Sequence, residues 1–157
     1  MSDSTERLSF LAQVIQKESD HLLFTANRLF KDSEVTEARV REWTQDADMA
    51  ERLDAFVARY SRLQDTLGDK LIPQLLLYLG EDLGPAVDNL DKAERFGWIP
   101  STDDWFTHRK LRNQMIHDYI DDPRILADAL EAGRLWVKPM VEVAAKLIEE
   151  IEKRTGN

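Results

Sequence analysis

Cysteine is absent from this chain of 157 residues, and several kinds of site are excluded with it. Disulfides, thiolate zinc sites, iron–sulfur clusters and cysteine nucleophiles all need a cysteine thiol, which this sequence lacks. Glycine and proline are scarce, with six and five residues. Three of them, Gly80, Gly84 and Pro85, stand close together and mark a loop.

Positive charge is also in deficit. The 21 lysines and arginines face 30 aspartates and glutamates, so the formal net charge is −9. A surface with this balance repels nucleic acid on average. Contact with RNA or DNA would therefore need a local basic site, or a dimer that brings two such sites together.

The sequence has no long apolar run. Its most apolar segment, residues 71–80 (LIPQLLLYLG), contains a proline and a glutamine and is too short to span a bilayer. The first ten residues lack the basic start and apolar run of a signal peptide. We therefore expect no membrane contact and a cytoplasmic location. The length fits one domain over residues 1–157 with its own hydrophobic core.

The spacing of apolar residues predicts helices and no strand. The expected helices cover residues 5–30, 36–43, 48 into the seventies, 86–96, 101 onward through the motif described below, and 123 to about 154. Pro73 should kink the long third helix or end its first half, because proline lacks the helical N–H donor. Asp121 or Asp122 should cap the last helix. These expectations describe an all-α, mostly antiparallel bundle of about four main helices plus short ones.

Residues 109–123, RKLRNQMIHDYIDDP, form a compact cationic cluster around one histidine. On a helix, Arg109, Asn113 and His117 lie along one side with Arg112 beside them, and Tyr119 follows if the helix persists. The same side is expected to carry Trp105, Ile116 and Ile120, with Leu111 and Met115 opposite. A side that mixes apolar and cationic residues suits a cleft or a subunit interface.

These residue types can cleave a phosphodiester. Histidine is the natural acid or base near neutral pH, and an arginine stabilises charge that builds on a phosphoryl group. Asn113 could orient the imidazole, and His108 and Lys110 could extend the basic patch with Arg109. No acidic and imidazole residues with metal-ligand spacing surround them, so the reaction would be metal-independent. One motif supplies one acid–base histidine, whereas a symmetric dimer that faces two motifs together supplies two.

A structural role explains part of the same pattern. An arginine and a histidine alone are common by chance, and an arginine can bridge helices through acidic partners. Arg59 and Arg62 could reach the motif from the long helix, or form a solvated face or an ion pair with Asp65. His21 is expected to be structural.

The longer string RNQMIHDY resembles the signature of the HEPN superfamily, which is R-x-x-x-x-H with a polar residue next to the arginine. Its trailing H-x-Y is similar to the HepT toxins, the partners of MNT-type minimal nucleotidyltransferases. The flanking WFTHRKL and IDDP, and the segment LDAFVARYSRLQDTLGDKL, agree with such proteins. The resemblance covers most of the chain from the middle of the long helix onward.

This resemblance implies a homodimer of helical bundles whose two motifs line one cleft, and a metal-independent endoribonuclease toxin without a cofactor. Arg112 would stabilise the transition state, Asn113 would support the site and His117 would be the acid–base group. The nucleotidyltransferase antitoxin would attach AMP to Tyr119 and so block the RNA cleft. Two alternatives stay open: a non-catalytic nucleotide- or substrate-binding module that pairs with a nucleotidyltransferase, and a purely structural helical dimer.

Overall fold

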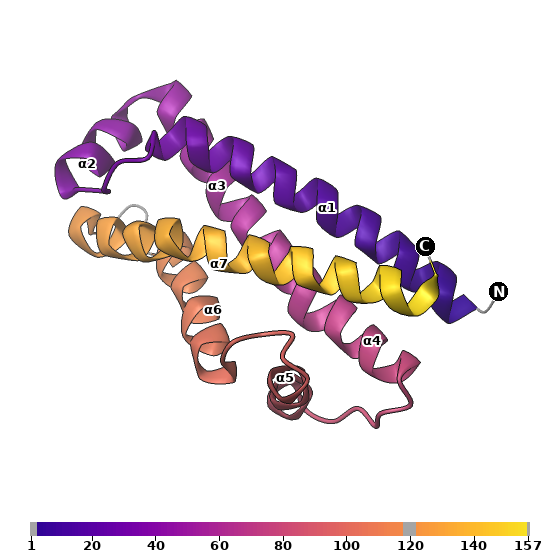
Figure 1. The fold of residues 1–157 in the computed structure, drawn as a ribbon. Coiled ribbons are helices and arrows are strands. Elements are labelled where there is room, and N and C mark those ends of the chain that lie inside the picture. The colour runs from indigo at the N-terminus through magenta and orange to yellow at the C-terminus, as the bar shows by residue number, and fades with distance from the viewer. Residues whose placement is uncertain (1–2, 118–121, 157) are drawn as a thin grey trace.

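The computed structural model describes residues 3–117 and 122–156, and all regular structure within them is helical (Figure 1). The elements are α1 (Asp3–Phe30), α2 (Glu37–Gln45), α3 (Ala47–Asp65), the π-helical segment η1 (Thr66–Leu71), α4 (Ile72–Tyr78), α5 (Ala86–Arg95), α6 (Thr102–His117) and α7 (Pro123–Thr155). The all-α prediction is therefore confirmed. None of these described helices combines the length and the apolar character needed to cross a membrane.

The helix starts follow the cap residues that the sequence offers. Thr36 accepts a hydrogen bond from the backbone N–H of Arg39 at the start of α2. Ser101 accepts one from the N–H of Asp104 at 3.1 Å, as expected for the helix that carries the motif. Asp122 caps α7, with Pro123 at its first position. Short polar side chains satisfy backbone donors that have no partner within the helix, so each of these elements begins where predicted.

Helix α1 packs against both α3 and α7 and runs antiparallel to each of them, as Figure 1 shows. Helix α6 crosses beneath this layer and contacts α3 and α7, while α5 links the end of α4 to α6. The largest side chains at the centre are almost fully buried: Phe30, Phe56, Tyr60, Trp98 and Trp105. Burying a side chain of this size stabilises the fold by roughly 1.5–3 kcal/mol.

The segment η1 joins α3 to α4, so that the three form one continuous helical rod from residue 47 to residue 78. The backbone N–H of Ile72 donates to the carbonyl of Leu67, five residues earlier. Pro73 follows at once, and proline has no N–H and clashes with the carbonyl four residues before it. A wider turn ahead of the proline relieves that clash. The interruption expected at Pro73 therefore takes the form of a π-helical turn, and this turn faces α6.

Candidate functional site

Two glycines let α6 pack closely against its neighbours. A Cβ atom added at Gly68 in η1 would lie 3.0 Å from Nε1 of Trp105, which is 1% exposed. A Cβ atom at Gly133 in α7 would lie 2.4 Å from Cε of Met115. A larger residue at either position would require Trp105 or Met115 to shift. Neither glycine belongs to the residues that the sequence singled out, although a glycine inside a helical pattern signals close packing.

The expected division of α6 into two sides needs a correction. Trp105 was expected on the motif side and Met115 on the opposite side, but both are buried in this chain's own core. The side chain of Arg112 lies on the arc between them and is 22% exposed. The arc is buried because α6 contacts α3 and α7 at once. Only the end of the motif side, with Asn113 and His117, is left exposed.

Both arginines that begin the motif are paired with carboxylates of the long rod. Arg112 Nη1 donates to Asp65 Oδ1. Arg109 donates to Asp69 through two parallel bonds, each 3.1 Å long. Asp65 and Asp69 are four residues apart, so they lie one above the other and face α6 together. The structural role that the sequence left open for the motif arginines is therefore present within a single chain.

The other basic candidates differ in their surroundings. The ring of His108 stacks on Trp136, with 3.8 Å between centroids and 3° between planes. Its Nδ1 lies 2.6 Å from the carbonyl oxygen of Asp104, which can only accept, so Nδ1 carries the proton. Lys110 is exposed. Arg59 donates to Thr25 of α1 and does not reach the motif.

A buried hydroxyl holds the middle of α6 in place. Tyr60 is fully buried, and its hydroxyl donates to the carbonyl oxygen of His108 at 3.2 Å. Burial raises the pKa of Tyr60 well above its usual range, an effect that the positive charge of Arg112 partly offsets. The phenol therefore stays neutral across physiological pH and acts as a fixed donor to the backbone of α6.

Asn113 and His117 are motif residues whose side chains remain available to contact a ligand. Both side chains are exposed, and neither makes a hydrogen bond or ion pair with another residue in the described part of the chain. They lie one helical turn apart at the end of α6. Tyr119, the expected site of AMP attachment, and Ile120 lie outside the described residues.

Glu18 of α1 adds a half-buried carboxylate beside η1. One of its oxygens accepts a hydrogen bond from the hydroxyl of Thr66 at 3.2 Å, and the other is buried without a partner among the described residues. Burial raises the pKa of Glu18. The hydrogen bond from Thr66 and the positive charge of Arg62 offset this rise only in part. A carboxylate held in this way carries a cost in stability at neutral pH.

Residues 3–117 and 122–156 hold no group of three or more His, Asp or Glu side chains arranged to hold a metal ion. What they do present is a guanidinium, an amide and an imidazole along the last two turns of α6. Comparison with known proteins found no matching family model, curated protein or solved structure. Any function must therefore be inferred from these residues and their geometry.

Proposed function

We propose that this protein is an endoribonuclease toxin of the HepT type, which acts as a homodimer and cleaves RNA without a metal ion. The observation that carries the proposal is the end of α6. There Asn113 and His117 are exposed and unpaired within the described residues, one and five positions after Arg112. This is the spacing of the R-x-x-x-x-H signature with its polar neighbour.

The proposed reaction needs two acid–base groups. His117 of one subunit takes the proton from the 2′-hydroxyl of the RNA, and that oxygen attacks the adjacent phosphorus. The partner subunit's His117 protonates the departing 5′-oxygen. The products are a 2′,3′-cyclic phosphate and a free 5′-hydroxyl. Arg112 stabilises the charge on the phosphoryl oxygens, with donors that its bond to Asp65 leaves free.

Exposed apolar residues support a second copy at this end of the molecule. Ile116 next to the motif is 51% exposed, and Ile125 in the first turn of α7 is 37% exposed. A short connection joins the two helices, so both isoleucines lie near the end of α6. A dimer that covered them would bring the two motifs together. Attachment of AMP to Tyr119 by a partner nucleotidyltransferase would then add bulk and negative charge to the shared cleft.

Cleavage of a defined RNA in EDTA tests the proposal. Wild-type protein, with an intact mass showing Tyr119 unmodified, should produce 2′,3′-cyclic phosphate ends. His117→Ala should lower the rate by roughly 10²–10⁴-fold, because it removes the acid–base group. His21→Ala is the matched control, because His21 is also an exposed histidine but lies on α1. Equal cleavage by wild type and His117→Ala would refute the role of His117.

Two observations favour the second candidate, a non-catalytic module that pairs with a nucleotidyltransferase. The motif arginines are held by Asp65 and Asp69, and the chain carries a net charge of −9. Such a surface suits docking onto a basic protein more than binding RNA. If wild-type protein bound a nucleotidyltransferase but left every tested RNA intact, this second function would replace the first.

A further inference from the structure

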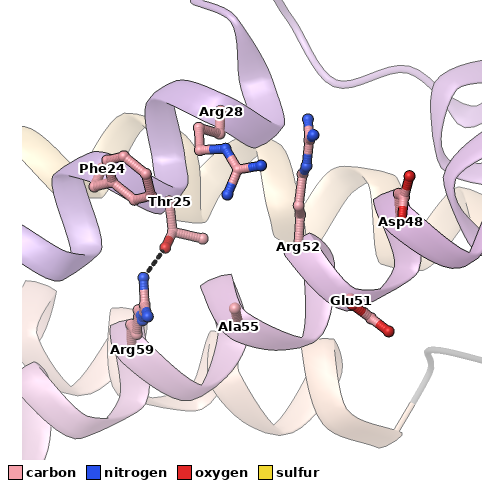
Figure 2. A pocket seen from close by; sticks show the side chains of 8 residues that line it. All are labelled: Phe24, Thr25, Arg28, Asp48, Glu51, Arg52, Ala55 and Arg59. Atoms are coloured by element: carbon pink, nitrogen blue, oxygen red, sulfur yellow. Dashed lines mark hydrogen bonds between the residues drawn. The ribbon is translucent and has the colours of Figure 1, made fainter.

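A pocket between α1 and α3 is lined by three arginines. It lies on the part of α3 before Asp65, the residue that pairs with Arg112 of the motif. Its volume is about 370 Å³. Figure 2 shows Arg28 on α1 and Arg52 and Arg59 on α3 around the opening. The small side chain of Ala55 lies between the two arginines of α3 and leaves the space open. No residue of the α6 motif lines this pocket.

None of the three guanidiniums forms an ion pair with another residue of the described chain. No carboxylate of residues 3–117 or 122–156 lies within ion-pair distance of Arg28, Arg52 or Arg59. Acidic residues outnumber basic ones by 30 to 21, so partners are abundant elsewhere. Three like charges around one hollow repel one another, and a bound anion would remove that repulsion.

The arginines are held ready by neutral contacts. Arg59 donates through Nη1 to the hydroxyl of Thr25 and to the carbonyl of His21, which leaves its other N–H groups free. Arg28 lies over the ring of Phe24, 5.3 Å from the ring centroid. That ring is 58% exposed. Planar guanidinium donors match the oxygens of a phosphate, and the exposed ring can contact an apolar or aromatic group attached to it.

Charge at one end of the pocket limits the size of the ligand. Asp48 and Glu51, near the start of α3, line the same pocket, and Figure 2 shows Glu51 directed away from the arginines. A nucleic-acid strand crossing the pocket would place phosphates beside these carboxylates. A compact anion could bind at the arginine end of the pocket, away from Glu51. The geometry therefore favours a small ligand over a strand.

We propose that Arg28, Arg52 and Arg59 form a binding site for a small phosphorylated molecule with at least two negative charges. The site is separate from the α6 motif and does not depend on the proposed ribonuclease activity. The ligand is either a phosphate compound without a base or a nucleotide whose base contacts Phe24. The two sources share the phosphate chemistry and differ in what Phe24 contributes.

Isothermal titration calorimetry at low ionic strength tests the site with pyrophosphate, ATP and a ten-nucleotide single-stranded RNA. Wild-type protein should bind pyrophosphate or ATP with saturation. Arg52→Gln and Arg59→Gln should each weaken binding about tenfold or more, because each removes hydrogen bonds from a charged group. Ala55→Leu should also weaken binding, because it fills the space without changing the charge. Arg41→Gln, on the exposed face of α2, should have no effect.

The same titrations show which of the two kinds of phosphate ligand the site binds. Tighter binding of ATP than of pyrophosphate, with the difference lost in Phe24→Ala, identifies a nucleotide. Equal binding of the two identifies a phosphate compound without a base. Thermal unfolding checks each variant, and Arg28→Gln serves as an exposed alternative if a change at the half-buried Arg52, Ala55 or Arg59 disturbs folding. The proposal fails if wild type binds neither compound, if Arg52→Gln and Ala55→Leu bind as wild type does, or if only RNA binds.

Discussion

Two groups of arginines in this protein have opposite surroundings. Arg109 and Arg112 on α6 each have a carboxylate of the long rod as a partner. Arg28, Arg52 and Arg59 between α1 and α3 have none among the described residues. Both sets face a neighbouring helix, so exposure alone does not separate them.

The difference teaches what each region is equipped to do. A paired guanidinium fixes the position of α6 and has only part of its donor set left for a ligand. Guanidiniums that form no ion pair keep their donors for a ligand, and the repulsion among them falls when an anion binds. In the paired region the exposed polar groups of the described part of α6 include Asn113 and His117, so chemistry is expected there from the imidazole. In the unpaired region binding of a compact phosphate is expected from the arginines themselves.

Gly68→Ala is expected to break the paired region and to have the largest effect on stability. The new Cβ would meet Nε1 of the buried Trp105 at 3.0 Å. Overpacking costs about 1–3 kcal/mol, and the gain in helix propensity returns about 0.5–1 kcal/mol, so the net loss should be about 1 kcal/mol. Urea unfolding measures the change in free energy.

The double variant Gly68→Ala/Trp105→Phe is the control for that contact. Phenylalanine lacks the indole nitrogen, so the penalty of Gly68→Ala should shrink in this background. A penalty of the same size in both backgrounds would show that the Trp105 contact is not its cause. A more stable Gly68→Ala variant would show that α6 can move outward without loss.

Arg112→Gln and Arg52→Gln sharpen the comparison by measuring pairing directly. Arg112→Gln removes the ion-pair partner of Asp65 and should lower the free energy of unfolding. The loss should be only about 0.5–1 kcal/mol, because the pair is partly exposed to solvent. Arg52→Gln removes a like charge and should leave that free energy unchanged or slightly higher. Equal losses in the two variants would mean that the two regions do not differ in this way.

Glu18→Gln tests the reverse case, a carboxylate that forms no ion pair within the described residues, and should have the smallest effect. Because burial raises the pKa of Glu18, the folded state favours its protonated form. That stability is fully present below the ordinary value of 4.5 and is lost as pH rises through the folded pKa. Glu18→Gln should therefore raise the melting temperature slightly at pH 7.

Glu131 provides the control, because its pKa is shifted downward whereas that of Glu18 is shifted upward. Its hydrogen bond from Arg134 lowers the pKa of Glu131, so its stabilising effect is present at neutral pH and lost as pH falls through the folded pKa. Glu131→Gln should lower the melting temperature at pH 7, where Glu18→Gln raises it. Parallel shifts in the two variants would contradict the assignment of these pKa directions.

The local pattern of the sequence predicts the helices well because caps act over a few residues. Ser101 and Asp122 are predicted as helix starts from their type and position, and both act as caps. The contacts of α6 are not predictable in this way, because they depend on residues 40 or more positions away, such as Asp69 for Arg109. The three-arginine pocket also escapes prediction, since Arg28 lies on α1 and its companions lie on α3.

The sequence by itself determined the helical class, the helix starts and the spacing that brings Arg112, Asn113 and His117 onto one helix. Helical periodicity and capping are local, so they can be read along the chain. Only the tertiary structure decided which charges are neutralised. Ion pairing depends on distances across helices, and the close approach at Gly68 and Gly133 sets those distances for α6. The same composition therefore yields paired arginines in one region and unpaired arginines in another.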